Sequence, residues 1–243
     1  MSIVKAAQSL SQADVQFRWP ASLPIPSEAQ EAQAIRSLFP DVNFGGSRRS
    51  LESELQRYTP RWDDMSSWQQ NQITAVCALI GFDLGQAIGL RTTVYRSAQP
   101  WKFEGNELET TEKAEAFEDQ VESILSAHRV EYQTQAQQLA SYRAARDAGS
   151  PLPPSPTPDF LVTSRLVIND RTVRWIEVKN FYGAGIEQGL KPWMPTLKIQ
   201  KQIAKYIQAY GPDGAVVLKH GYAMRFRARM PECVQLLDAA MLR

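Results

Sequence analysis

Residues 155–180 read SPTPDFLVTSRLVINDRTVRWIEVKN, and this stretch carries the clearest structural signal in the chain. Apolar and polar residues alternate in FLVTSRLVI and TVRWIEVKN, which is the period of two that is typical of β-strands. Between the two runs stands Asn169-Asp170-Arg171, a turn signal. The simplest structure is therefore an antiparallel hairpin, which carries Asp159 at its entrance and Glu177 and Lys179 near its end.

The charged residues of this hairpin suggest a chemical role. Glu177 and Lys179 point to the same face of an extended strand, because successive side chains alternate between faces. The turn brings Asp159 back beside Glu177, so that the two carboxylates can approach each other. Close carboxylates repel and raise each other's pKa unless a cation lies between them, and Mg²⁺ accepts one or two carboxylates together with water and phosphate. The alternative is an ordinary surface ion pair of Glu177 and Lys179, but Asp159 across the hairpin favours a catalytic interpretation.

Composition limits the class of protein. With 243 residues, 43% of them hydrophobic, the chain can bury a core of one large domain or of one domain with a helical annex. No run approaches the roughly 18 apolar residues of a membrane helix, and the first residues lack the apolar centre of a signal peptide. We therefore expect an intracellular protein, in the nucleus or the cytoplasm. Two cysteines and two histidines are too few for a disulfide framework or a zinc cluster.

The net charge of +1 hides an asymmetry along the chain. Residues 1–158 hold 14 Lys and Arg against 19 Asp and Glu, whereas residues 159–243 hold 13 against 7. A net charge of −5 thus precedes a net charge of +6. Positive charge gathered in one region is expected of a protein that binds a polyanion.

Three regions follow from the pattern of breakers and periods. Residues 1–26 read as an arm interrupted by prolines, and residues 27–103 as a helical N-terminal region with three or more helices. Residues 104–243 read as an α/β domain. The apolar residues of its first helix share one helical face; they are Phe117, Val121, Ile124 and Leu125. A short strand and a second helix lead to a proline-rich connector and the hairpin.

The C-terminal part alternates between the two periods. Residues 195–210 predict a helix whose apolar side is followed by Gly211, and AVVLKH predicts a short buried strand. YAMRFRARM, residues 222–230, alternates like a strand, and PECVQLLDAAML, residues 231–242, is expected to form a closing helix. A strand at 222–230 would place Arg225, Arg227 and Arg229 on one side, either to bind phosphates or to guard a sheet edge against aggregation.

Three sequence blocks resemble a known family. Pro158-Asp159 followed by Glu177-Val178-Lys179 resembles the signature of the PD-(D/E)xK, or restriction-endonuclease-like, nuclease superfamily. Thr157-Pro158-Asp159, Trp175 to Lys179 and Ala209 to Pro212 are similar to the blocks of the TPD-motif family that includes the codanin-interacting nuclease. The resemblance implies a mixed sheet flanked by helices, with a core ordered helix, three strands, helix, strand (αβββαβ). The chain departs from the family after Lys179, where Asn180-Phe181-Tyr182-Gly183 is one residue longer.

The resemblance also implies roles for individual residues. Asp159 and Glu177 would bind Mg²⁺, for which Mn²⁺ can substitute, with the carbonyl of Val178 as a third ligand. Lys179 would assist the attacking water. The superfamily places a further glutamate on the first core helix, which corresponds to Glu118; Glu115, Asp119 and Glu122 on the same helix are rivals.

The helix at 195–210 carries the other candidates. The resemblance assigns Gln202 to orienting water or phosphate, and Tyr206 shares its face. Lys198, Lys201 and Lys205 form a basic stripe that, with Tyr206, could follow a phosphate backbone. A solvated helix face is the alternative for the stripe.

We therefore expect a Mg²⁺-dependent nuclease that hydrolyses phosphodiester bonds with metal-activated water. The alternative is a non-catalytic module on the same fold that binds nucleic acid or protein. Two further expectations are a protein partner for the helical N-terminal region and a homodimer.

Overall fold

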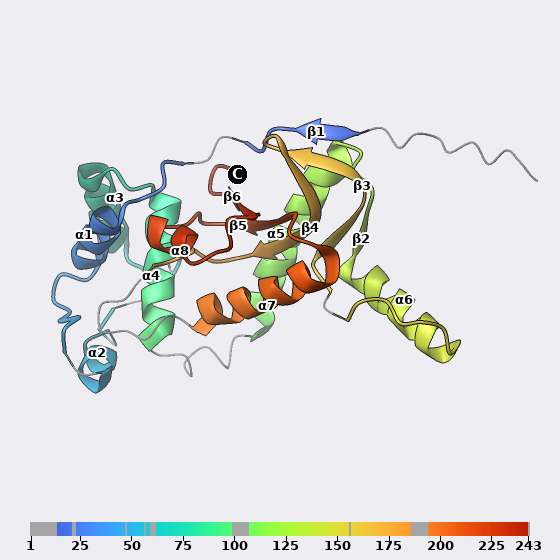
Figure 1. Cartoon of the computed structure of the whole chain (residues 1–243). Helices are drawn as coiled ribbons and strands as arrows, with labels where there is room; N and C mark the ends of the chain where they lie inside the picture. The colour runs from blue at the N-terminus through green and yellow to red at the C-terminus, as the bar shows by residue number, and fades with distance from the viewer. Residues whose placement is uncertain are drawn as a thin grey trace, which may run out of the picture.

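The computed structural model describes residues 14–20, 23–46, 48–55, 57–58, 62–98, 107–155, 157–185 and 194–242. These residues form an α/β structure with a six-stranded mixed sheet and eight helices (Figure 1). The strands are β1 (Val15–Phe17), β2 (Tyr132–Thr134), β3 (Phe160–Ile168), β4 (Arg171–Lys179), β5 (Gly214–Leu218) and β6 (Val234–Asp238). The helices are α1 (Glu28–Leu38), α2 (Arg48–Leu55), α3 (Ser67–Ile80), α4 (Leu84–Ala98), α5 (Glu107–Ala127), α6 (Gln135–Asp147), α7 (Met194–Tyr210) and α8 (Met224–Ala228).

The predicted hairpin is confirmed. β3 and β4 pair antiparallel, and the turn residues Asn169 and Asp170 both have positive φ, 49° and 64°. Asn and Asp tolerate this left-handed conformation, and a two-residue turn with both residues at positive φ matches the twist of a hairpin. The pairing shifts register between Leu161 and Leu166, so β3 carries a bulge. Beyond the bulge, Phe160 pairs with Ile176, which brings the two predicted carboxylates to the same end of the hairpin.

The remaining strands extend this hairpin on both sides. β5 pairs parallel with β4 and β6 pairs parallel with β5, so the order along the sheet is β1-β3-β4-β5-β6. β1 pairs parallel with one end of β3 and β2 pairs antiparallel with the other end. The strand β1 lies within residues that the sequence suggested to be an arm, so this part of the arm belongs to the sheet.

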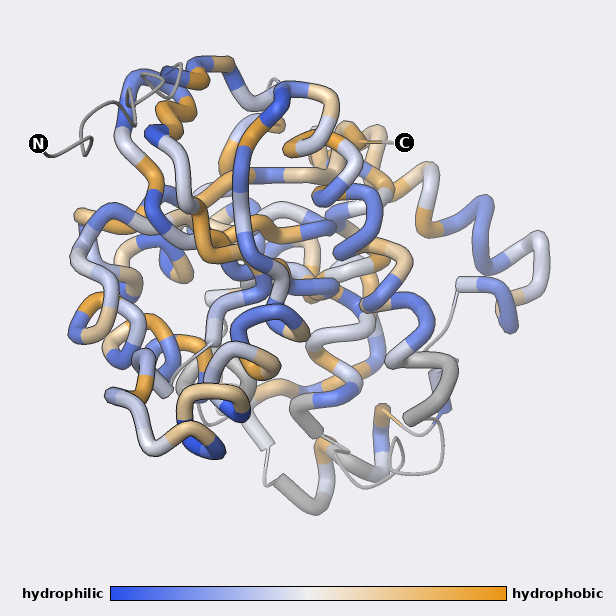
Figure 2. The backbone as a smooth tube through the Cα atoms, turned by 90° about the vertical axis from the view of Figure 1, so that its right-hand side faces the viewer, coloured by the Kyte–Doolittle hydropathy of each residue, from blue (hydrophilic) through white to orange (hydrophobic). Residues whose placement is uncertain are grey.

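Two helices cover opposite faces of the sheet. On one face, Phe117, Val121 and Leu125 of α5 pack against apolar residues of β3, β4 and β5. On the other face, Ile199 and Ile203 of α7 pack against β4, β5 and β6 (Figure 1). Figure 2 shows that hydrophobic and hydrophilic stretches alternate along the backbone. The apolar faces predicted for both helices are therefore the ones that are buried.

The last two predicted elements are wrong. Residues 224–228 form the helix α8 rather than a strand. The reason is that Tyr222, Phe226 and Met230 recur every four residues, and all three are buried in the core that α7 also lines. Residues 234–238 form the strand β6 rather than a helix, and all five are buried. A short apolar run such as VQLLD fits either a buried strand or a helix, and here pairing with β5 decides.

The N-terminal helices α1 to α4 lie within residues 27–103, the predicted helical region, and pack around one core. This core extends into the α/β part, because it includes Tyr182 and Ala223. Gly89 of α4 lies so close to this part that a Cβ atom there would be 2.6 Å from the Cβ of His220 and 2.8 Å from that of Tyr182. The helical region is thus packed directly against the segment that follows β4.

A buried glutamate links the helical region to the same segment. Glu31 of α1 is 4% exposed, and its Oε1 accepts a hydrogen bond of 3.0 Å from the backbone N–H of Gly185. Burial raises the pKa of Glu31 to about 7, although Gly185 and the charge of Arg225 act in the opposite direction. This pKa lies above that of an unfolded glutamate, so protonation of Glu31 stabilises the folded chain. This contribution to the free energy of unfolding is complete at acidic pH and is lost as the pH rises through about 7.

We therefore predict that Glu31→Gln gains stability relative to the wild type as the pH rises. The amide cannot ionise, so only the wild type loses the contribution of Glu31, between about pH 4.5 and pH 7. Urea unfolding of both chains across this range measures the difference in free energy of unfolding. A difference that stays constant with pH would contradict the prediction.

Candidate active site

The structure brings Asp159 and Glu177 together at one end of the β3–β4 hairpin. Asp159 immediately precedes β3, and its Oδ2 accepts a hydrogen bond of 2.7 Å from the backbone N–H of Val178. Val178 lies in β4 between Glu177 and Lys179. The carboxylate of Asp159 is therefore fixed beside the backbone segment that carries the other two charged residues.

Glu177 is the most enclosed member of the site. It is 1% exposed, and its carboxylate forms an ion pair with the ammonium group of Lys179 and accepts a hydrogen bond of 2.9 Å from the hydroxyl of Tyr206. A buried carboxylate is stable only if it is paired and hydrogen-bonded, and both oxygens here have a partner. The side chain of Lys179 is 26% exposed, so it is less enclosed than that of Glu177.

The titration properties show that the charges interact. Burial and the negative charge of Glu177 together raise the pKa of Asp159 to about 7, against the opposing effects of Lys179 and of the hydrogen bond from the Val178 N–H. Burial would lower the pKa of Lys179, but Glu177 and Asp159 outweigh it and raise this pKa. Two carboxylates thus share one ammonium group, which leaves an excess of negative charge when both are ionised.

Glu118 of α5 faces the same group of charges. Its side chain is half-buried, which raises its pKa, while Lys179 lowers the pKa and Glu177 raises it. Of the rivals, Glu115 and Asp119 are exposed, and Glu122 accepts a hydrogen bond of 2.9 Å from the hydroxyl of Tyr132. Glu118 is therefore the glutamate of α5 whose environment fits the predicted position.

The donors present fit a hard divalent cation. Among the described residues, no three Asp, Glu, His or Cys side chains gather closely enough to form a metal site by themselves. Mg²⁺ does not need three, since it usually retains several waters and uses one or two carboxylates. Asp159 and Glu177 would supply these carboxylates, and a cation would relieve their excess negative charge. The Val178 carbonyl stays a predicted ligand.

Tyr206, which was predicted to bind nucleic acid together with the lysines of α7, is buried, with 1% of its surface exposed. Its hydroxyl instead contacts Glu177, receives a hydrogen bond of 2.6 Å from Nε2 of Gln202, and lies 3.1 Å from the carbonyl oxygen of Thr157. Tyr206 therefore orients Glu177, and Gln202 reaches the site through Tyr206. Burial and Glu177 both raise the pKa of Tyr206, so that it stays protonated as a donor.

The predicted basic stripe is accessible. Lys198, Lys201 and Lys205 are all exposed on α7. Lys205 also lines a groove of about 560 Å³ with Pro154, Ser155, Gln208 and Ala209. A second groove of about 930 Å³ begins at Ala209 and runs over the β3–β4 hairpin past Arg165 and Arg174. Of the three lysines, Lys205 thus lines a surface groove, and Ala209 lines both grooves.

Arg225, Arg227 and Arg229 were predicted to share one face of a strand, and this prediction is wrong. They lie in and directly after the helix α8, where Arg225 pairs with Glu28 of α1 and Arg227 donates a hydrogen bond of 2.8 Å to the carbonyl of Val234. The Arg229 carbonyl accepts a hydrogen bond of 2.8 Å from Gln200. The contacts of Arg225 and Arg227 join elements of the fold.

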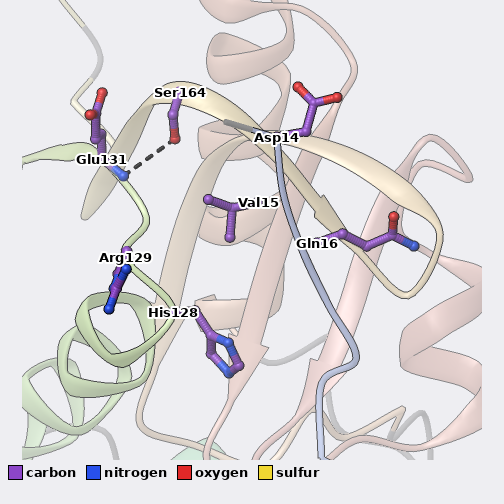
Figure 3. Close-up of a pocket in the computed structure, with 7 residues that line it drawn as sticks. All are labelled: Asp14, Val15, Gln16, His128, Arg129, Glu131 and Ser164. Carbon is purple, nitrogen blue, oxygen red and sulfur yellow. Dashed lines mark hydrogen bonds between the residues drawn. The ribbon is translucent and has the colours of Figure 1, made fainter. Parts of the chain in front are cut away.

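Another pocket, of about 350 Å³, opens at the β1 edge of the sheet (Figure 3). Acidic and basic side chains both line it, and its backbone is held by a hydrogen bond of 3.3 Å from the Glu131 N–H to the hydroxyl of Ser164. The ring of His128 stacks on Phe17 with ring centres 4.1 Å apart. None of the predicted site residues lines this pocket. Its lining residues are Asp14, Val15, Gln16, His128, Arg129, Glu131 and Ser164.

Sequence reasoning missed the residues that hold the segment before β3. Gln135 and Gln138 of α6 donate hydrogen bonds to the backbone of residues 157–159. Both lie in a polar stretch, TQAQQLASY, in which no sequence pattern distinguishes these two glutamines from Gln137. Only the pairing of β2 with β3 brings them to the site.

No single helix among the described residues is both long enough and apolar enough to cross a membrane. Helices α3 and α4 meet these criteria only as a pair, Ser67–Ile80 with Leu84–Arg96, and the chain bends by 112° between them.

Comparison with known proteins identifies one family. No curated protein and no solved structure matches the chain. A family model described as a protein of unknown function with the TPD sequence motif matches residues 90–240, which is more than half of the chain. The match includes Thr157-Pro158-Asp159, the segment that carries the site. The chain therefore belongs to the TPD sequence-motif family, whose function is unknown.

Proposed function

We propose that the chain is a nuclease of the PD-(D/E)xK superfamily that hydrolyses phosphodiester bonds with the help of Mg²⁺ or Mn²⁺. One observation carries the proposal: Asp159, Glu177 and Lys179 converge at one end of the β3–β4 hairpin, with the Asp159 carboxylate 2.7 Å from the Val178 nitrogen. The proposal is supported by the order α5, β2, β3, β4, α7 and β5 along the chain, which is the order that the resemblance implies apart from α6, inserted between β2 and β3. The superfamily fold is part of the proposal.

The chain's own residues would divide the work as follows. Asp159 and Glu177 would hold the cation, which when bound lowers the pKa of water and withdraws charge from the phosphoryl oxygen. Lys179, held beside them by its ion pair, would stabilise the negative charge that develops as water attacks phosphorus. Tyr206 keeps Glu177 in place, and Gln202 fixes the hydroxyl of Tyr206. Glu118 would adjust the charge of the site from α5.

The direct test is incubation of the purified chain with labelled single-stranded, duplex and branched DNA and RNA. Parallel reactions contain Mg²⁺, Mn²⁺ or EDTA. Cleavage that requires the metal supports the proposal. Binding that persists in EDTA without cleavage under any condition favours the non-catalytic module instead. The predicted protein partner of the helical region and the predicted homodimer stay predictions.

The basic stripe provides a separate prediction about substrate binding. Replacing both Lys201 and Lys205 with Gln is expected to reduce the slope of log K against log salt by about 1.8 for a duplex, since each phosphate contact contributes about 0.9. Fluorescence anisotropy in EDTA measures this slope without cleavage. Arg143→Gln, on the exposed surface of α6, is the control and should leave the slope unchanged. Equal slopes in all chains would show that the lysines are only a solvated face.

A further inference from the structure

The backbone of the Thr157-Pro158-Asp159 segment is held from outside its own strand. The carbonyl of Asp159 accepts a hydrogen bond of 3.1 Å from the N–H of Gln135, and that of Pro158 accepts one of 2.9 Å from Nε2 of Gln138. Both donors belong to the first turn of α6. The backbone on either side of the Asp159 nitrogen is therefore tied to α6.

Gln138 is an unusual residue for its position. α6 extends away from the body of the protein (Figure 1), and Gln138 is its one buried residue, at 5% exposure. A helix that contacts its protein through one side normally buries apolar residues there. Here the buried residue is polar, and it lies against the segment that carries Asp159.

The hydrogen bonds of Gln138 show why an amide is present. Its Nε2 donates to the carbonyl of Gln133 at 3.0 Å and to that of Pro158 at 2.9 Å. Carbonyl oxygens can only accept, so the nitrogen of the amide must face them. This orientation leaves Oε1 buried and without a hydrogen-bond partner among the described residues. A buried acceptor without a donor costs stability, and a Met or Leu would avoid that cost.

Proline makes this support necessary. Pro158 has no N–H, so its carbonyl is the one main-chain group through which this residue can be held by hydrogen bonds. β3 begins only at Phe160, which leaves Asp159 outside the strand. Without Gln138, the peptide group that joins Pro158 to Asp159 would lose its anchor, and the carboxylate could shift from the Val178 N–H.

We propose that Gln138 is a positioning residue of the active site. Through the Pro158 carbonyl it sets the place of the Asp159 carboxylate beside Val178 and the Glu177–Lys179 pair. Its effect on catalysis rests on the proposed nuclease function, whereas its effect on the geometry does not. Replacing a residue that orients a metal ligand typically lowers metal affinity or activity by about 10- to 100-fold.

The test compares Gln138→Met with Gln137→Met. Gln137 is the adjacent, exposed glutamine of the same helix turn, and it caps α6 through its hydrogen bonds with Thr134. Hydrogen exchange of the Val178 amide, followed by NMR in the metal-free chain, reports whether Asp159 still accepts its hydrogen bond. We expect exchange about tenfold faster or more in Gln138→Met and little change in Gln137→Met. Should Gln138→Met fail to fold, Gln138→Asn, which is too short to reach both carbonyls, replaces it.

Metal binding and kinetics complete the test. The same variant is expected to bind Mn²⁺ about 10- to 100-fold more weakly by electron paramagnetic resonance, and to lose kcat more than KM. Unchanged Val178 exchange together with unchanged Mn²⁺ affinity would overturn the proposal. Faster Val178 exchange in a chain whose wild type neither binds Mn²⁺ nor cleaves would retain the positioning role and refute the nuclease function.

Discussion

Asp159→Asn is expected to lower the rate of nucleic-acid cleavage by about 10³-fold or more, with little change in the folded structure. The amide oxygen of Asn can still accept the hydrogen bond from the Val178 N–H, so the local backbone keeps its anchor. What is lost is the negative charge that would hold the cation. Glu177→Gln should have a similar effect, because it removes the second carboxylate while the hydroxyl of Tyr206 retains a partner.

Steady-state cleavage in Mg²⁺ measures the effect, and thermal unfolding checks that each variant is folded. Asp63→Asn removes an exposed carboxylate from the helical region and serves as the charge control. It should cleave like the wild type. Undiminished cleavage by the Asp159 and Glu177 variants would mean that the activity resides elsewhere or belongs to a contaminant.

Gly214→Ala is expected to lower the free energy of unfolding by about 3 kcal/mol and to abolish cleavage as well. A Cβ atom at Gly214 would lie 2.0 Å from the indole ring of Trp175 on the neighbouring strand. The indole cannot easily move, because its Nε1 donates a hydrogen bond of 3.0 Å to the Gly211 carbonyl. If it does move, it displaces Tyr206, whose ring centre lies 5.3 Å from that of Trp175 and whose hydroxyl holds Glu177.

Urea unfolding measures the loss, with Gly45→Ala as the matched control. The nearest atom to a Cβ at Gly45 is 3.4 Å away, which is an ordinary contact. A Gly214→Ala chain as stable as the wild type would show that Trp175 has room to retreat. A chain that is destabilised but fully active in mild conditions would show that the position of Trp175 does not affect cleavage.

The sequence predicted those parts of the fold that depend on local patterns. The period of two, with a turn at Asn169-Asp170, was enough for the hairpin, and the period of 3.6 was enough for α5 and α7. The last two elements could not be assigned in this way. Residues 222–230 alternate over a few positions by coincidence, and β6 is short enough for tertiary burial to override its helical pattern.

The candidate site shows the same limit. Asp159, Glu177 and Lys179 could be placed near one another because one hairpin carries all three. The contact of Tyr206 with Glu177 requires the packing of α7 on β4, and that of Gln138 with Pro158 requires the pairing of β2 with β3. Contacts between elements that are distant in sequence depend on tertiary geometry, which periodicity does not encode.

The burial of Tyr182 bears on how this family could vary during evolution. The ring lies three positions after Lys179 and is enclosed in the core of the N-terminal helices. A fragment that began after those helices would expose this ring to water next to the end of β4. The helical region is therefore a part of the fold that Tyr182 requires. If a relative lacks or replaces this region, we expect a smaller or more polar residue at the position of Tyr182.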